Sequence, residues 1–506
     1  ITYEEDGGLT ITVEIIEGDQ YAVNNVKIEG DLIKPVDELL KKISINKEKF
    51  INREMVRRDT MVLREAYADE GYAYAEVAPL VKEDDEKKWV DITYRISHGE
   101  KVRFERINIS GNSQTRDNVI RRELQVVEGG YFSGEGMRKS TRNLHRLGFF
   151  EDLEIRTVKG SRDDLMILDI NVKERATGAF SLGVGYSSFD KTLAIFRVEQ
   201  NNLFGRGQKI LGMAKLGAKT HEFLLEFTEP WFLDRRISAG IELYNWEREY
   251  DEYTKNSLGA GLNFKIPLNI DEFTRGLVGY TYDVSDITDI EDTTAVAIKE
   301  MAGTNVTSSM NFGLERDSRD RIWNPSKGSI NKVLFEYAGG ILSGDVYYNK
   351  YEATSAWYFP LPWQTVFMIQ GRVGYLEQRP GGKLPIYQKY QIGGINTVRG
   401  FESYSISPRD PATGDKIGGE KMMVYNLEYR FPLLKEQGLM GIFFFDAGNV
   451  YSKDENYAFS DIKKSVGTGV RWYSPVGPLR VEYGKVLGPK ENEPSGNWEF
   501  TVGGFF

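Results

Sequence analysis

The sequence predicts a multidomain fold in which small α+β modules precede a 16-stranded antiparallel transmembrane β-barrel, and three observations favour it. One pattern of strands and helices occurs twice within the first 175 residues. Alternation of apolar and polar residues, the period of a β-strand, then dominates residues 176–506. Turns marked by proline or glycine recur along that second part at regular intervals, as in a barrel of up-and-down strands.

The repeat in the first part is visible by direct alignment. Residues 11–30 (ITVEIIEGDQYAVNNVKIEG) match residues 92–111 (ITYRISHGEKVRFERINISG), and the two glycines that they share lie 81 positions apart. A fixed period indicates repeated structural modules. The chain begins inside such a repeat and without methionine, so we expect natural sequence upstream. The expected domains are residues 1–20, the end of a preceding module; 21–99 and 100–175, two complete modules; and 176–506, the barrel.

Each complete module is expected to contain a strand, two helices and two further strands. Pro35 suits the first turn of a helix, and Gly71 and Gly148 are expected to cap helices at their C-terminal ends. In the first module the predicted elements are strand 22–29, a short helix from Pro35, helix 53–70, and strands 73–82 and 89–97. In the second they are strand 102–109, helices 115–124 and 134–147, and strands 151–159 and 164–173. Such modules could be spacers, or an exposed strand edge could pair with an extended client chain by β-augmentation.

Turns allow the barrel strands to be counted. Seven turns, on the side where both barrel ends lie (the near side), are predicted at residues 201–207, 229–235, 266–269, 324–328, 359–362, 431–438 and 474–478. Seven such turns imply about 16 strands and eight far-side loops. In 498–502, Trp498 and Phe500 alternate with Glu499 and Thr501, and the charged face is expected to line the lumen. A soluble β-sandwich would bury the same apolar residues in a core, but the regular turns favour the barrel.

Composition limits the function classes. The longest apolar cluster is residues 438–445, so no transmembrane helix is predicted, while 28 Tyr, 27 Phe and 8 Trp suit the aromatic girdles of a barrel. No cysteine is present, which excludes disulfides and thiolate metal sites. The net charge of -10 and the lack of a Lys/Arg block disfavour nucleic-acid binding. His98, His145 and His221 show no metal-ligand spacing, so no cofactor, metal or catalytic site is expected.

One far-side loop, residues 378–420, is unusually long and includes the segment GGINTVRGF at 393–401. Paired glycines beside a lone arginine indicate a folded tip. If this tip enters the lumen, Arg399 needs an anionic partner, and Glu428 and Asp446 lie on nearby strands. The candidate latch residues are therefore Val398, Arg399, Gly400, Phe401, Glu428 and Asp446. The latch could be functional or purely structural.

At these residues the chain resembles the BamA family of outer-membrane insertases, whose soluble repeats are POTRA (polypeptide-transport-associated) domains. The similarity is densest in GNSQTRDNVIRREL, RLGFFEDLEIRTV, VKERATGAFSLGVGYSS, ERDSRD followed by NPSKG, GGINTVRGF, FFFDAGNV and RWYSPVGPLRVEYG. The resemblance implies five POTRA domains, so 21–99 and 100–175 would be the fourth and fifth and 1–20 a fragment of the third. It also implies 16 barrel strands, an arginine (here Arg399) packed inside the barrel against acids, and the lipoprotein BamD as a partner on the last POTRA domain. The chain departs from the family pattern in two places: its loop around Arg399 is short for that family, and two glycines stand just before the C-terminal aromatic residues.

The function that the resemblance implies is insertion of unfolded outer-membrane β-barrel clients into the bilayer of a Gram-negative outer membrane, with the POTRA domains in the periplasm. A lateral gate is expected between residues 178–188 and 496–506, because glycine weakens strand interiors. Its candidate residues are Gly178, Gly183, Gly185, Gly503, Gly504 and Phe506. These glycines could instead relieve crowding in a curved sheet.

Other functions are weaker interpretations of this sequence. A translocation pore of the two-partner-secretion kind is the main alternative, but its relatives usually carry two POTRA domains, and the partial third repeat at residues 1–20 argues against it. A passive porin needs no POTRA domains. An enzyme is least favoured, because the GGINT stretch at 393–397 lacks the strand–glycine–helix context of a phosphate-binding loop.

Overall fold

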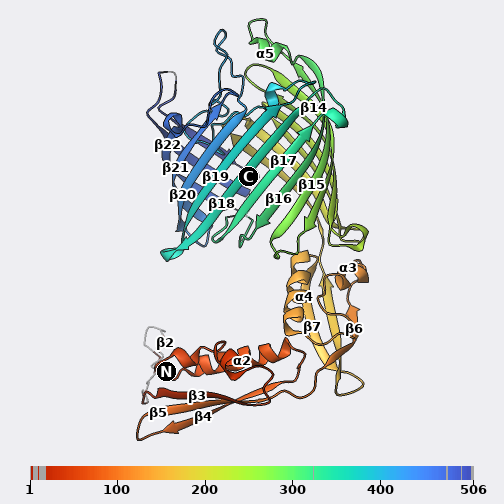
Figure 1. Ribbon diagram of the computed structural model, residues 1–506, viewed down its shortest axis with the longest axis vertical. Coiled ribbons are helices and arrows are strands. Elements are labelled where there is room, and N and C mark those ends of the chain that lie inside the picture. Colours follow the sequence, from red (N-terminus) through yellow and green to blue (C-terminus); the bar gives the residue numbers. More distant parts are fainter. Residues whose placement is uncertain are drawn as a thin grey trace. The chain divides into compact units, whose positions relative to one another are not determined.

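The computed structural model describes residues 2–3, 9–10, 19–322, 324–474, 477–491 and 493–502. The chain forms two compact units, Ile1–Ala176 and Thr177–Phe506, which Figure 1 shows in red to yellow and in yellow to blue. Within the described residues, none of the helices has both the length and the apolar character that a membrane crossing requires. Near the N-terminus, β1 (Thr2–Tyr3) and β2 (Leu9–Thr10) form a short antiparallel pair.

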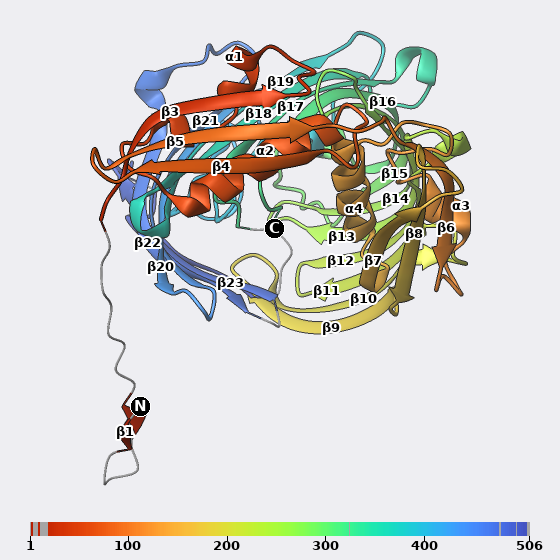
Figure 2. The ribbon, with the colours of Figure 1, turned by 90° about the horizontal axis from the view of Figure 1, so that it is seen from below.

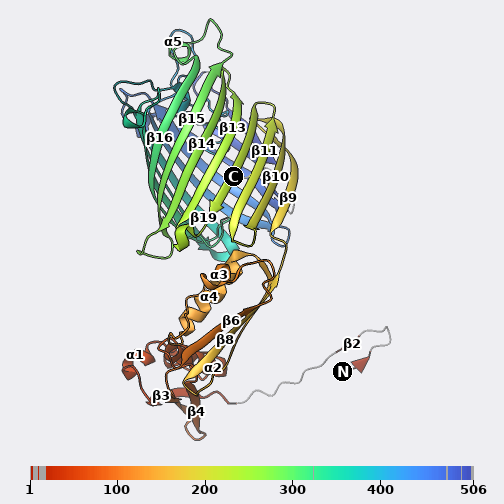
Figure 3. The ribbon, with the colours of Figure 1, turned by 90° about the vertical axis from the view of Figure 1, so that its right-hand side faces the viewer.

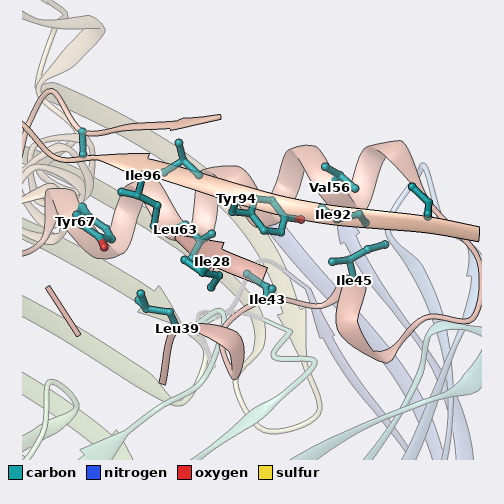
Figure 4. Packing of buried hydrophobic residues seen from close by; sticks show 13 residues of the cluster. Ile28, Leu39, Ile43, Ile45, Val56, Leu63, Tyr67, Ile92, Tyr94 and Ile96 are labelled. Carbon is teal, nitrogen blue, oxygen red and sulfur yellow. The ribbon is translucent and has the colours of Figure 1, made fainter. Parts of the chain in front are cut away.

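The first module consists of a three-stranded sheet packed against helices. Its elements are β3 (Ala22–Gly30), α1 (Val36–Leu40), η1 (Ile45–Lys47), α2 (Arg53–Ala68), β4 (Glu76–Asp84) and β5 (Trp89–Ser97). The sheet order is β3-β5-β4, with β3 parallel and β4 antiparallel to the central strand. The helix α2 begins where the Asn52 side chain accepts hydrogen bonds from two free N–H groups. Its buried face, including Leu63 and Tyr67, packs on Tyr94 and Ile28 of the sheet (Figure 4).

The second module repeats this topology, as the sequence repeat predicts. Its elements are β6 (Arg103–Ser110), α3 (Asp117–Arg121), α4 (Gly134–Leu147), β7 (Phe150–Lys159) and β8 (Leu165–Glu174), with the sheet order β6-β8-β7. Gly148 has a left-handed conformation and caps α4, as expected. Gly71 differs: α2 ends earlier, its cap is Asp69, and Gly71 lies two residues beyond it. The expected helix 115–124 is likewise shorter, because it forms only the five residues of α3.

Glu174, at the end of β8, fastens the loop that precedes α3. Its carboxylate accepts hydrogen bonds from the backbone N–H groups of Gln114 (2.8 Å) and Thr115 (2.6 Å) and from the Ser113 hydroxyl (2.9 Å). Burial by itself would raise the pKa of this carboxyl, but the hydrogen bonds from Thr115, Gln114 and Ser113 outweigh it and lower the pKa to about 2.

Acid is therefore expected to weaken the second module through Glu174. A carboxyl whose pKa is lowered by folding stabilises fully above its ordinary pKa of 4.5, and this stabilisation is lost as the pH falls towards 2. Glu174→Gln should lower the free energy of unfolding by about 2 kcal/mol at neutral pH and remove this part of the acid sensitivity. Urea unfolding of the detergent-solubilised chain, followed by its far-UV helical signal, measures both. Glu151→Gln, in an exposed pair with Lys173, is the matched control, and equal acid sensitivity in wild type and Glu174→Gln would contradict the assignment.

The second unit is a barrel of 16 antiparallel strands, which confirms the predicted fold class and strand number. The strands are β9 (Gly178–Ser187), β10 (Lys191–Leu203), β11 (Gln208–Gly217), β12 (Thr220–Glu229), β13 (Ser238–Glu249), β14 (Thr254–Pro267), β15 (Thr274–Thr288), β16 (Gly303–Asp317), β17 (Gly328–Ala338), β18 (Tyr348–Leu361), β19 (Thr365–Gln378), β20 (Lys421–Leu434), β21 (Leu439–Tyr451), β22 (Lys463–Ser474), β23 (Gly477–Leu487) and β24 (Gly496–Val502). Each strand pairs with the next in sequence (Figures 2 and 3). The last strand, β24, meets the first, β9. The short connections on the near side lie at the seven predicted turns.

The far-side loops and some turns contain short helical segments. These are α5 (Val296–Lys299), η2 (Phe232–Asp234), η3 (Gly340–Leu342), η4 (Pro362–Gln364), η5 (Ile386–Gln388) and η6 (Phe459–Asp461). The strand faces alternate as predicted: in β24, Trp498 and Phe500 are exposed on the outside, whereas Glu499 and Thr501 are buried. The charged side chains therefore line the lumen, where the candidate latch residues meet.

Candidate functional site: a buried latch beside a weakly paired seam

The loop between β19 and β20 folds back into the barrel. Its apolar residues Ile392, Val398 and Phe401 are buried in one cluster with wall residues such as Val424 and Val450. Within the loop, an antiparallel bridge joins Ile392 to Ile406. The loop therefore has a folded tip, and packing against the wall holds the segment Val398–Phe401 inside the lumen.

Arg399 is the centre of the tip and is only 2% exposed. Its guanidinium binds Asp446 of β21 with two nitrogens, Nε to Oδ2 and Nη2 to Oδ1, both at 2.7 Å. The backbone N–H of Arg399 donates to the same carboxylate at 3.0 Å. A third nitrogen, Nη1, reaches Glu428 of β20 at 2.7 Å and Glu482 of β23 at 2.8 Å. The guanidinium also lies over the ring of Phe444, 3.6 Å from its centroid.

Further arginines complete the charge pairing around Arg399. Arg471 binds Glu428 through Nη2 at 2.6 Å and Glu482 through Nε at 2.8 Å. Arg430 pairs with Glu428 at 2.7 Å, and Arg480 with Glu482 at 2.8 Å. All these side chains are buried. Charges out of contact with water need partners of opposite sign, so this network defines one geometry for the tip and makes removal of a single member costly.

Gly400 extends the contacts of the latch to the last strand, β24. Its N–H donates to Glu499 Oε1 of β24 at 2.8 Å. A Cβ atom on Gly400 would lie 2.8 Å from the carbonyl oxygen of Gly484 in β23, and a Cβ on Gly484 would lie 2.5 Å from the Gly400 nitrogen. Two glycines thus let the loop backbone cross a strand at close range. The tip consequently contacts β20, β21, β23 and β24.

Among the described residues of the barrel, β9 and β24 share fewer register pairs than any other two neighbouring strands. β9 pairs with β10 from Gly178 to Ser187, but in the described part of the chain its register with β24 consists of one pair, Ser187 with Thr501. Next to this pair, the Ser188 N–H donates to the Phe500 carbonyl at 3.2 Å. Outward-facing residues of β9 are unusually uncovered, with Phe180 82% and Leu182 74% exposed. Among the described residues, β24 therefore pairs with only the Ser187 end of the β9 edge.

The predicted residues fall on both features. Arg399, Glu428 and Asp446 are brought together, with Val398 and Phe401 packed around them. Gly178, Gly183 and Gly185 lie on β9 at the seam, whereas Gly503, Gly504 and Phe506 lie outside the described residues. A Cβ on Gly183 would come no closer than 4.0 Å to Ile195 O, so crowding does not explain this glycine.

Sequence reasoning did not assign partners to Glu482, Glu499, Arg471 and Arg480. Alternation along β23 and β24 predicts that the carboxylates of Glu482 and Glu499 lie in the lumen, and this is the only signal of their role in the sequence. It could not show that Glu482 meets an arginine 83 positions earlier. The lumen also contains a polar cavity of about 410 Å³ beneath the latch, and a cavity of about 490 Å³ with a mixed lining lies beside the seam. No group of three or more metal-binding side chains occurs among the residues that the structure covers.

Comparisons with known proteins match both units. The family model described as the Omp85 superfamily domain matches residues 202–506, and that described as POTRA, surface antigen variable number repeat, matches 21–99 and 102–175. An outer membrane protein assembly factor BamA from Nitratidesulfovibrio vulgaris is 34% identical over 513 residues, which cover all of this chain and 64% of that relative. The chain thus spans somewhat less than two thirds of that protein.

Solved structures show the same fold. The structure of BamA from Haemophilus ducreyi lacking POTRA domains 1-3 aligns with 95% of this chain and 99% of its own, with a TM-score of 0.74 and 22% identity. CdiB from Acinetobacter baumannii aligns with 99% of this chain and 92% of its own, with a TM-score of 0.56 and 13% identity. The similarity to CdiB is the weaker of the two in both TM-score and sequence identity.

Proposed function

The chain belongs to the Omp85 superfamily, and from this membership we propose that it folds and inserts β-barrel client proteins into the outer membrane. The barrel lies in the outer membrane and the POTRA domains in the periplasm, where unfolded clients arrive. The name of the relative from Nitratidesulfovibrio vulgaris, an assembly factor for outer membrane proteins, supports this activity. The two complete modules would correspond to the last two POTRA domains, and 1–20 to the end of a third.

The observation that carries the proposal is the seam. An unpaired backbone N–H or C=O group costs several kcal/mol in hydrocarbon, which makes insertion of a lone client strand slow. The edge of β9 would offer such a strand a row of backbone partners at membrane depth, and along the described residues β24 pairs with it only at Ser187. The gate residues Gly178, Gly183 and Gly185 add no side chains of their own to this edge, whose outward face includes Phe180 and Leu182. Pairing at the edge would satisfy the client backbone before its own barrel closes.

The latch gives the gate one fixed side. Arg399 and Gly400 bind carboxylates on β21 and β24 from the lumen, so the last strands are held from within. Within the described part of the chain, no hydrogen bond or ion pair is seen between this loop and β9. Opening would therefore move β9 away from a stationary β24 rather than the reverse.

The POTRA sheets supply a second pairing surface in this scheme. In each sheet the outer strands, β4 and β7 among them, pair on one side only, with β5 and β8. Extended clients would add to such an edge by β-augmentation. An outer-membrane lipoprotein such as BamD would dock on the last POTRA domain, residues 102–175. A pull-down of a client with the wild-type or Glu151→Gln chain would report binding but not the strand that is contacted. Crosslinking of the client from single positions on β4 and on β7 would identify the edge that it contacts.

The activity is tested by timing the folding of a urea-unfolded outer-membrane barrel in liposomes that contain this protein. We expect folding at least about tenfold faster than in liposomes with an unrelated barrel, a barrier lowered by about 1.4 kcal/mol or more. The shift of the folded client on an unheated gel measures the rate. Client-dependent conductance without faster folding would instead support the export pore, and no response in either assay would contradict the proposal for this chain.

A further inference from the structure

Three near-side turns share an unusual backbone conformation. They are Leu203–Arg206, Phe232–Arg235 and Pro362–Thr365, and each is closed by a hydrogen bond from its fourth N–H to its first carbonyl. Both central residues of each turn have positive φ. Two consecutive residues with positive φ are typical of a type I′ turn, whose preferred sequence is asparagine followed by glycine.

The residues at the first central position do not suit that conformation. They are Phe204 (φ 53°), Leu233 (φ 56°) and Trp363 (φ 57°). A bulky side chain in the left-handed region is a conformational outlier, and such strain persists where the side chain has a function. Most other non-glycine residues with positive φ in the described chain are polar or charged, for example Lys88, Asp289 and Asn324.

Packing does not explain these residues either. Phe204 and Leu233 are each 77% exposed, and Trp363 is 87% exposed. A strained backbone would be relieved by asparagine or glycine, and little buried surface would be lost by that change. The three positions thus hold large apolar side chains away from the protein at the tips of the turns.

The outer wall of the barrel leads directly to these tips. On β18, Trp357, Phe359 and Leu361 face outward at every second position, and Trp363 follows two residues later. Beside Leu233, the ring of Phe232 packs 5.9 Å from Phe264, which lies in the outward-facing row of β14. The tips therefore continue the surface that faces lipid, beyond the ends of the strands.

We propose that Phe204, Leu233 and Trp363 are membrane anchors, which insert into the boundary between headgroups and acyl chains of the near-side leaflet. Amphipathic and apolar side chains favour this depth. Exposed basic residues follow two of the tips, Arg206 after Phe204 and Arg235 and Arg236 after Leu233, at the level of the lipid phosphates. The proposal requires only that the barrel spans a membrane and is independent of the insertase activity.

Spin labels at single cysteines test the depth of each tip, and the chain contains no cysteine of its own. Labels replace Phe204, Leu233 or Trp363 in turn, and the neighbouring central positions Asp234 and Gln364 serve as matched controls. In liposomes of phosphatidylethanolamine and phosphatidylglycerol, we expect the ratio of oxygen to aqueous nickel-reagent accessibility to be about threefold or more higher at the tips, since this depth excludes the aqueous reagent.

A label-free measurement guards against perturbation by the spin label. Lipids brominated near the headgroup should quench wild-type tryptophan fluorescence more than that of Trp363→Phe, with the difference lost when the bromines lie at the bilayer centre. Equal nickel accessibility at tips and controls would overturn the proposal. So would tips that are accessible in plain liposomes but become protected when an unfolded client is added, because the surface would then bind protein rather than lipid.

Discussion

A disulfide between positions 187 and 501 is expected to reduce client folding to the rate seen in liposomes without the protein. Ser187 and Thr501 form the register pair of the seam. Cα atoms of paired antiparallel residues lie about 4.5–5.5 Å apart, within the range of about 4.4–6.8 Å that a disulfide spans. The double variant Ser187→Cys, Thr501→Cys would therefore close the edge that we propose for client pairing. Gel-shift timing of client folding, before and after reduction, measures the effect.

The controls separate a locked gate from a damaged barrel. Reduction should restore the rate, and each single cysteine variant should behave as wild type. A disulfide between positions 281 and 309, which form a register pair inside the continuous wall of β15 and β16, should leave folding unchanged. Undiminished folding by the oxidised seam variant would show that β9 and β24 need not separate.

Arg399→Ala is expected to produce the largest loss of stability, about 3–5 kcal/mol. The substitution leaves Asp446, Glu428 and Glu482 without the guanidinium that they share in the lumen. Arg399→Lys should recover only part of the loss, because an ammonium cannot bind Asp446 with two nitrogens in one plane. The midpoint of urea unfolding in detergent, read from the gel shift of the barrel, measures both variants.

A surface pair provides the comparison for Arg399. Arg316 pairs with Asp271 at a near-side turn at 2.8 Å and is partly exposed, so Arg316→Ala should cost no more than about 1 kcal/mol. The link to the gate is tested by Glu499→Leu, which removes the acceptor for the Gly400 N–H, and by Glu499→Gln, which keeps one. Faster crosslinking across the seam in the leucine variant alone would indicate that the latch holds β24. Equal losses from Arg399→Ala and Arg316→Ala would contradict the central role of Arg399.

Local patterns in the sequence determined the architecture of this protein. The side-chain period of a strand is two, so alternation in segments such as 498–502 assigned each residue to lumen or lipid without knowledge of the neighbouring strands. Proline and glycine mark turns for steric reasons, which made the strand number countable. The 81-residue repeat predicted two modules of one topology. Arg399 was found because a lone cation in a long loop requires an anion nearby.

Only the tertiary structure decided which groups meet. Glu482 is 83 positions from Arg399, and Glu499 is 99 positions from Gly400. The shear of the barrel and the entry of the loop into the lumen bring these residues into contact. The register pair described at the seam likewise depends on how far the closing strands slide past each other. The left-handed tips at Leu233 and Trp363 went unpredicted because their sequences contradict the local preference of the turn. Alternation and turn chemistry act between near neighbours, whereas pairing across the lumen and closure of the barrel depend on the whole chain.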